Sequence, residues 1–337
     1  MQPEPRSSRA PAIGQALGAT WREPLIRLAL ASAALIAASA REWGEMLHQW
    51  WNIDTYNHIV LVPAILVWLV WMKREELAQV EPREWAPGLA LVAAALGLWV
   101  AGRFTGINLL AHAGAVGAVQ GAVVALLGAR VAALLALPLC FAVFLVPFGD
   151  ELIPPLQFVT AEIAAALTRL GGIPAQIDGI HIQTPVALFI VAEACSGVKF
   201  LAAMTALAVL VCFTRFASWK RRAAFMVAAI LVPILANGVR AWGTILVAQS
   251  WGVEFAQGFD HIVYGWVFFA LVVALLLGIA WRFFEREPED HGWRAADLAG
   301  SAYLARSESG ESASRGMFIA ILALSLVAAI VAFATMV

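Results

Sequence analysis

Long runs of apolar residues, hardly interrupted by charge, dominate this chain. A helix needs about 20 mostly apolar residues to cross a bilayer, and nine segments approach that length. They are 25–40, 58–72, 87–101, 107–127, 131–148, 195–213, 223–247, 261–284 and 317–337. Charged residues make up only 13% of the sequence, about half of the share that a soluble domain carries. The sequence therefore predicts an all-α polytopic membrane protein, a bundle of about eight or nine transmembrane helices.

The distribution of Lys and Arg gives an orientation, because cytoplasmic loops hold the excess of these residues. With the N-terminus inside, 17 of the 22 basic residues fall in inner segments. The remaining five fall on the outer side or in outer helix halves: Arg41, Arg103, Arg169, Lys199 and Arg240. We therefore expect the N-terminus to lie in the cytoplasm.

The spans and the polar stretches divide the chain into four regions. We expect a cytoplasmic N-terminal segment (1–24), a transmembrane catalytic core (25–285), a flexible cytoplasmic linker (286–316) and a peripheral C-terminal transmembrane helix (317–337). Within the core, 149–194 forms a small outer, periplasmic loop subdomain. Its 156–170 stretch has the apolar spacing of a helix that suits the membrane surface, and 176–191 alternates around Asp178-Gly179, which favours a hairpin. Segment 28–40 can also be interpreted as a cleaved signal peptide, although multispan proteins usually keep their first helix.

Charge and cysteine content exclude several classes of protein. The net charge of −1 gives no basic excess for binding nucleic acid. Three cysteines without a CxxC pair argue against a disulfide framework, a thiol-redox relay and a tetrahedral zinc site. We predict no metal site and no cofactor. Cys195 and Cys212 flank one apolar run, so they should lie near opposite membrane faces.

Polar groups inside apolar spans are energetically expensive, which makes them candidates for function. The first such motif is Glu193-Ala194-Cys195-Ser196-Gly197, where the outer loop enters a span. A thiol at the N-terminal end of a helix lies near the positive end of the helix dipole and near free N–H groups, which stabilise a thiolate. Gly197 allows another backbone to approach. The alternative is an ordinary buried cysteine, and we assign Cys140 and Cys212 to that class.

Two further motifs contain an arginine and a histidine. In Asn237-Gly238-Val239-Arg240, the Asn and Arg side chains share one helix face, although an arginine that snorkels to headgroups is an alternative. In the segment from Asp260 to Gly265, His261 and Tyr264 share a face where the chain re-enters the membrane from outside. An interfacial histidine beside an aromatic belt is the alternative there.

The predicted topology places Cys195, Arg240 and His261 at the same depth of the bilayer. Nucleophilic acyl transfer needs these three residue types. A thiolate attacks a carbonyl, a cation stabilises the oxyanion, and an imidazole transfers protons.

In this order, the motifs resemble those of the exosortases, which form a superfamily of multispan transpeptidases with the archaeosortases. The resemblance covers roughly 50–281 and is most specific at ACSG (194–197), NGVR (237–240) and the His261 segment. It implies that Cys195 is the nucleophile, Arg240 the catalytic arginine and His261 the third catalytic position. Archaeosortases have an arginine at that third position, so His261 favours the bacterial branch. Supporting or substrate-binding roles then fall to Glu193, Ser196, Gly197, Asn237 and Tyr264, with helix capping by Glu193 and helix packing by Asn237 as alternatives.

The resemblance also implies partners and a location. Exosortases are thought to cleave precursors with a C-terminal sorting signal, which consists of a Pro-Glu-Pro motif, a transmembrane helix and a basic cluster. The expected partners are such membrane-anchored precursors, membrane lipids and an unidentified cell-envelope acceptor. The expected location is a bacterial inner membrane with the active site at the periplasmic face, and a link to exopolysaccharide export. Some relatives continue into a further domain, which this chain either lacks or has lost by truncation.

Two other functions fit parts of the pattern. A transporter or channel would use Arg240 and His261 in a substrate pathway, with Cys195 incidental. A membrane hydrolase would use Ser196 as its nucleophile, but the glycine two residues earlier that a serine elbow needs is missing.

Overall fold

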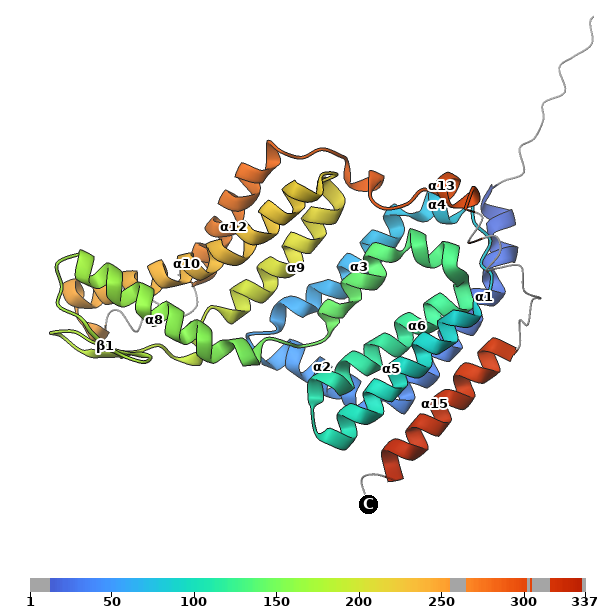
Figure 1. The fold of residues 1–337 in the computed structure, drawn as a ribbon, viewed down its shortest axis with the longest axis horizontal. Helices are drawn as coiled ribbons and strands as arrows, with labels where there is room; N and C mark the ends of the chain where they lie inside the picture. Colours follow the sequence, from blue (N-terminus) through green and yellow to red (C-terminus); the bar gives the residue numbers. More distant parts are fainter. Residues whose placement is uncertain (1–12, 255–264, 302–303, 305–315, 335–337) are drawn as a thin grey trace, which may run out of the picture. The chain divides into compact units, whose positions relative to one another are not determined.

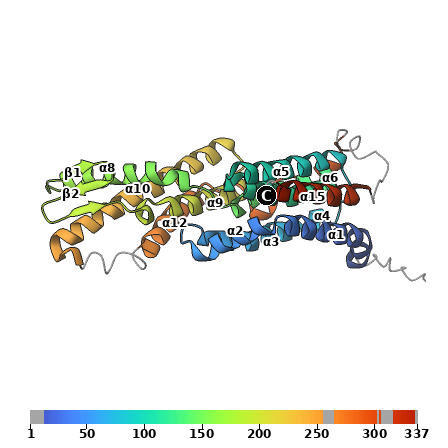
Figure 2. The ribbon, with the colours of Figure 1, turned by 90° about the horizontal axis from the view of Figure 1, so that it is seen from below.

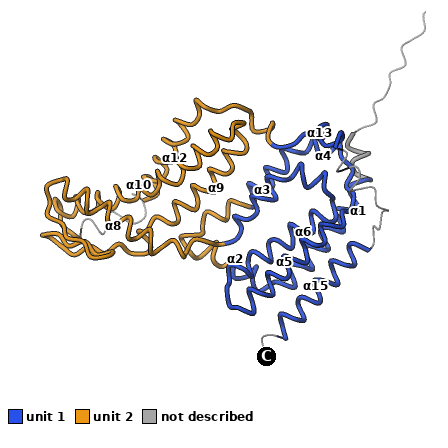
Figure 3. The backbone as a smooth tube through the Cα atoms, viewed as in Figure 1, with its two compact units in different colours: residues 1–47, 63–146, 292–337 blue, residues 48–62, 147–291 orange. Residues whose placement is uncertain are grey.

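The computed structural model of the chain describes residues 13–254, 265–301, 304 and 316–334. Helices make up most of it, and a single small sheet is described (Figure 1). The chain divides into two compact units (Figure 3). Unit 1 comprises Met1–Leu47, Pro63–Val146 and Gly292–Val337, and unit 2 comprises His48–Val62 and Pro147–His291. The predicted transmembrane catalytic core (25–285) thus contributes residues to both units.

Unit 1 is built from membrane helices of both chain ends. Its elements are α1 (Ile13–Ala38), most of α2 (Ala40–Asn52), α3 (Val62–Met72), α4 (Arg74–Leu77), α5 (Ala86–Thr105), α6 (Asn108–Leu134), α7 (Ala136–Phe141), η2 (Ala142–Leu145), α13 (Ala295–Ala299) and α15 (Gly316–Ala334). The C-terminal helix α15 contacts α1 and α5, and its Ile321 is fully buried. One face of α15 thus packs on the core cluster of this unit, and its predicted peripheral position stays a prediction.

Helices α5 and α6 run side by side in unit 1 because glycines let their backbones approach. A Cβ atom added to Gly114 would lie 2.3 Å from the backbone nitrogen of Trp99, and one added to Gly102 would lie 2.3 Å from that of Ala111. In lipid, small residues at helix interfaces allow the close van der Waals packing that holds helices together. These glycines account for the apolar core of the unit.

The predicted membrane class is confirmed, while the count of eight or nine spans stays a prediction. Five described helices are long and apolar enough to cross a membrane: Ala86–Thr105, Asn108–Leu134, Glu193–Arg215, Trp219–Trp251 and Gly316–Ala334. The count rises to seven if two bent pairs each form one span, and two shorter apolar helices, Asn57–Met72 and Gly265–Trp281, complete the set. The predicted 25–40 span lies in α1 as far as Ala38, and an 84° bend between α1 and α2 follows at its end. At the bend, the Ser39 hydroxyl donates to the Leu35 carbonyl at 2.8 Å, a bond that competes with regular helix geometry.

Unit 2 holds the outer-loop subdomain and three apolar helices. Its main elements are η1 (Asn57–Leu61), η3 (Asp150–Leu152), α8 (Ile153–Leu170), β1 (Gln176–Asp178), β2 (His181–Gln183), β3 (Leu188–Ile190), η4 (Glu193–Cys195), α9 (Val198–Arg215), α10 (Trp219–Trp251), α12 (Gly265–Trp281) and η6 (Pro288–Asp290). Helix α8 lies along α10 in both views (Figures 1 and 2). The stretch predicted as a surface helix thus buries one face against another helix.

The predicted hairpin around Asp178-Gly179 is confirmed. Strands β1 and β2 pair antiparallel, with Asp178 opposite His181, and Gly179 at the turn has a φ of 58°, which favours glycine. The sequence analysis missed β3, which pairs with β2 on its other edge. Ile182 of β2 is buried with alanines of α8, so the sheet is attached to this helix.

Part of the predicted linker, residues 293–298, packs within unit 1. The Ala295 amide donates to Glu76 Oε2 at 2.7 Å, and Lys73 Nζ donates to the Trp293 carbonyl at 3.2 Å. Ala295 and Leu298 are buried in a core cluster of unit 1. Side chains of the α3–α4 region therefore fix residues 293–298, a contact across more than 200 positions that local composition does not reveal.

Candidate active site

Cys195 lies three residues before the first residue of helix α9, near the helix N-terminus as the sequence predicted. It ends the short 3₁₀ turn η4, in which the Cys195 amide donates to the Ala192 carbonyl at 2.8 Å. Gly197 follows with a φ of 85°, and α9 begins at Val198. Cys195 is partly exposed, whereas Cys140 is exposed in unit 1 and Cys212 is buried near the other end of α9.

Gly197 has a different role from the one expected. A Cβ atom at this position would lie 2.8 Å from Cγ of Asn237, so a side chain approaches the glycine rather than another backbone. The left-handed conformation also favours glycine, because other L-residues adopt it only at a cost of about 1–2 kcal/mol. Gly197 thus lets Asn237 of α10 reach the turn that contains Cys195.

Asn237 connects this turn to two helices. Its side-chain amide donates to the Cys195 carbonyl at 2.8 Å and to the Thr160 hydroxyl of α8 at 3.0 Å. The Thr160 hydroxyl in turn donates to the Ser196 carbonyl at 3.5 Å. Asn237 is 3% exposed and Thr160 1% exposed. Sequence analysis missed Thr160, whose only signal was a hydroxyl on the apolar face of its helix.

Arg240 lies one turn after Asn237 on α10 and is 7% exposed. Its guanidinium carbon is 5.7 Å from the centre of the Phe200 ring, a contact that aligns a cation over an aromatic face. A Cβ atom at Gly265 would come within 3.2 Å of Nη1 of Arg240. Among the described residues, no carboxylate pairs with Arg240. This buried position does not fit an arginine that snorkels to headgroups.

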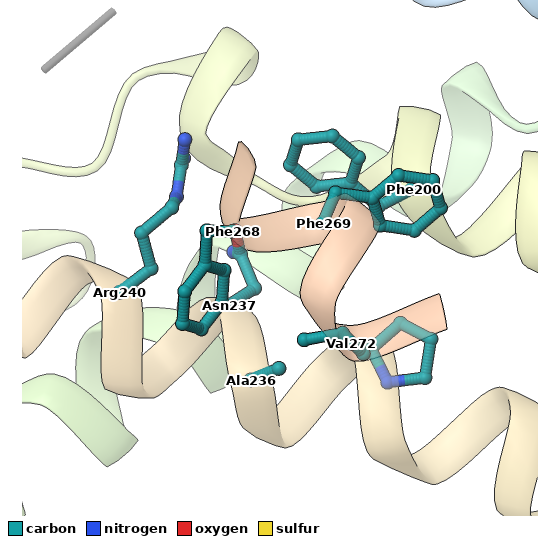
Figure 4. A pocket seen from close by; sticks show the side chains of 8 residues that line it. Phe200, Ala236, Asn237, Arg240, Phe268, Phe269 and Val272 are labelled. Atoms are coloured by element: carbon teal, nitrogen blue, oxygen red, sulfur yellow. The ribbon is translucent and has the colours of Figure 1, made fainter. Parts of the chain in front are cut away.

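A small pocket extends inward from these two polar side chains (Figure 4). It is lined by Phe200 of α9, by Pro233, Ala236, Asn237 and Arg240 of α10, and by Phe268, Phe269 and Val272 of α12. Its volume of about 10 Å³ is comparable to one water molecule. Phe200 and Phe269 stack with their ring centres 4.6 Å apart. The polar groups therefore lie against an apolar aromatic wall.

The other predicted site residues fall in different surroundings. Glu193 is exposed at the start of η4. Ser196 is 2% exposed, and its hydroxyl accepts from the Val198 amide at 3.4 Å. His261 and Tyr264 lie outside the described residues, so their roles stay predictions. Within the described ranges, no three His, Cys, Asp or Glu side chains gather as a metal site.

The fold defines a polytopic helical membrane protein that buries an arginine and an asparagine beside a thiol-bearing turn. Residues 50–278 match the family model of the transmembrane exosortases. This chain therefore belongs to the transmembrane exosortase family, whose members are in general membrane cysteine transpeptidases that act in protein sorting. No curated protein and no solved structure matches the chain. All three predicted motifs lie within the matched range.

Proposed function

We propose that the protein cleaves membrane-anchored precursors that carry a C-terminal Pro-Glu-Pro motif, a transmembrane helix and a basic cluster. Cleavage would occur at the outer face of the inner membrane, in a pathway linked to exopolysaccharide export. Cys195 serves as nucleophile, Arg240 stabilises the oxyanion and His261 transfers protons. The observation that most supports this proposal is the hydrogen bond from Asn237 to the Cys195 carbonyl. It joins the thiol-bearing turn to the helix of the buried arginine, one turn from Arg240.

The reaction proceeds in two steps. The Cys195 thiolate adds to the scissile carbonyl, the C–N bond breaks, and the leaving amine takes a proton from His261. The product is a thioester between Cys195 and the precursor, and the C-terminal anchor is released. Water or an acceptor group of the cell envelope then gives a proton to His261 and attacks the thioester, which breaks the C–S bond and restores the thiolate.

The burial of Arg240 supports its role in both steps. Removing a charge from water costs several kcal/mol, and a charged residue at membrane depth usually marks a functional site. An oxyanion next to a buried guanidinium gains more than it would in water, because the local dielectric constant is low. Removing one such donor from an oxyanion site typically lowers the rate by about 10²–10³.

The surroundings of Cys195 and Ser196 favour the thiol as nucleophile. The Ser196 hydroxyl is buried and accepts from the Val198 amide at the start of α9. This bond keeps the hydroxyl within the turn, next to the first residue of α9. Cys195, in contrast, is partly accessible, as a nucleophile must be to reach a precursor. Glu193 and Tyr264 are proposed as secondary contacts for the substrate.

The test is cleavage of a co-expressed precursor bearing this tripartite signal. We expect Cys195→Ala to lower cleavage by at least about 10³-fold, since no covalent intermediate can form. Cys140→Ala and Cys212→Ala serve as matched controls and should cleave within a few-fold of the parent. Unimpaired cleavage by a stably expressed Cys195→Ala protein would overturn the proposal. The transporter interpretation predicts that result, together with loss of function in Arg240→Ala.

A further inference from the structure

Helix α8 contains none of the three sequence motifs, yet it contacts the turn of Cys195 on both sides. We propose that Gln157 and Thr160 of α8 are positioning residues that hold this turn in register with Arg240. The inference rests on the proposed function, because it takes Cys195 as the nucleophile. Since both residues lie in the outer-loop subdomain (149–194), this subdomain would then be part of the catalytic apparatus.

Gln157 fixes the chain before the turn. Its side chain is 8% exposed, and its amide donates to the Val191 carbonyl at 2.7 Å. Val191 directly follows strand β3 and precedes Cys195 by four residues. Its own amide donates to the Ile180 carbonyl at 3.0 Å. The entry to the turn is thus attached both to the sheet and to α8.

Thr160 fixes the chain after the turn. It lies on the same face of α8 as Gln157, one helical turn further on. Its hydroxyl donates to the Ser196 carbonyl and accepts from Asn237. Helix α8 therefore binds positions 191 and 196, and Asn237 binds the carbonyl of Cys195 between them.

Few backbone hydrogen bonds of the described residues hold the turn itself. Residues 192–194 are exposed. Among the described residues, the backbone bonds within the turn run from the amides of Cys195 and Ser196 to the carbonyls of Ala192 and Glu193. Because a displacement of about 1 Å at a reacting group can cost about 10²-fold in rate, the bonds from α8 and α10 are well placed to control reactivity.

Helix α8 is held firmly enough to act as a reference for this turn. Ala161, Ala164 and Ala165 have no exposed surface, and they let α8 lie close to its neighbours. On α10, a Cβ atom at Gly238 would lie 2.4 Å from Cγ2 of Ile163. The same two helices thus present Thr160 and Asn237 to each other at hydrogen-bond distance.

The test compares two threonines of α8. Thr160→Val removes the hydroxyl that bonds the turn, while the control Thr168→Val removes an equally buried hydroxyl that donates to Ala164 of its own helix at 2.7 Å. With the precursor described above, we expect Thr160→Val to lower kcat by about 10-fold or more, with KM changed less than twofold. Thr160→Ser should restore the rate, and Thr168→Val should match the parent.

A second pair keeps the test informative if Thr160→Val does not accumulate. Gln157→Met removes the amide that holds Val191, and Gln120→Met removes an amide of α6 that donates to the Leu139 carbonyl in unit 1. Only Gln157→Met should lower kcat. Equal kcat values within each accumulating pair, with an inactive Cys195→Ala, would overturn the inference alone. An active Cys195→Ala would overturn both the inference and the proposed function.

Discussion

The two units each bury an arginine, but the surroundings of the two side chains differ. In unit 1, Arg103 of α5 donates to Glu42 of α2 at 3.1 Å, and the two side chains are 10% and 3% exposed. His112 of α6 contacts Glu45 at 3.3 Å. In unit 2, Arg240 is buried against Phe200, and no carboxylate of the described ranges neutralises it.

This difference favours a structural role for the charges of unit 1 and the proposed catalytic role for Arg240. A buried pair joins two helices, and its charges compensate each other within the fold. Within the described residues, Arg240 has no carboxylate that compensates its charge in this way. The negative charge that develops in the transition state of the proposed reaction would compensate it. Charges of unit 1 should therefore affect stability, and Arg240 should affect rate.

The largest effect is expected where a pair is broken in unit 1. Arg103→Met leaves Glu42 buried without its cation, and removing one partner of a buried pair typically costs about 3–5 kcal/mol. Thermal unfolding in detergent measures the loss. The double variant Arg103→Met with Glu42→Met is the control and should recover most of the stability. An unchanged unfolding temperature in the single variant would contradict the comparison.

A smaller effect, of a different kind, is expected in unit 2. Arg240→Gln should lower precursor cleavage by about 10²–10³-fold, which corresponds to roughly 3–4 kcal/mol of transition-state stabilisation. Its unfolding temperature should not fall, because a buried charge is removed. A variant that loses stability in proportion to activity would assign Arg240 to structure instead.

The contact between Gly197 and Asn237 gives a third prediction. Gly197→Ala combines a left-handed backbone with a Cβ atom 2.8 Å from Asn237. Gly172→Ala is the control, since Gly172 has a φ of 80° but nothing within 4 Å of an added Cβ. Both should lose about 1–2 kcal/mol of stability. Only Gly197→Ala should also lose cleavage, by about 10-fold, and equal rates would show that the contact is unimportant.

The smallest effect concerns an exposed carboxylate of unit 2. The pKa of Glu285 is lowered because the Ser218 backbone amide donates to it, followed by that of Ala217, with Arg221 and Arg286 adding attraction. A lowered folded-state pKa stabilises the fold above the unfolded pKa of 4.5, and this stabilisation disappears as the pH falls further. The unfolding temperature of the parent should therefore drop more between pH 6 and 3 than that of Glu285→Gln. Identical slopes would contradict this assignment.

Local sequence patterns predicted much of this molecule. Apolar length gave the membrane class, Asp178-Gly179 gave the hairpin, and the order of motifs pointed to Cys195, Asn237 and Arg240. Asn237 and the turn of Cys195 do meet, because α10 passes the start of α9. These features depend on residues that are close in sequence, so hydrophobic periodicity and turn or charge patterns can predict them.

The remaining features depend on residues far apart in the chain. Thr160 bonds Asn237 across 77 positions, and Arg103 pairs with Glu42 across 61. A threonine on an apolar helix face is also compatible with a bond to its own helix, as Thr168 shows. Only tertiary packing decides between these partners, so neither contact could be inferred from composition.

The approach of Asn237 to Gly197 also restricts how this protein can evolve. Any replacement of Gly197 introduces a Cβ atom into the space that Asn237 occupies. A smaller residue at 237 would restore the space, yet it would remove the amide that bonds Cys195 and Thr160. A single substitution at either position therefore disrupts the contact between residues 197 and 237. Among homologous chains, the two sites should therefore be retained or exchanged as a pair.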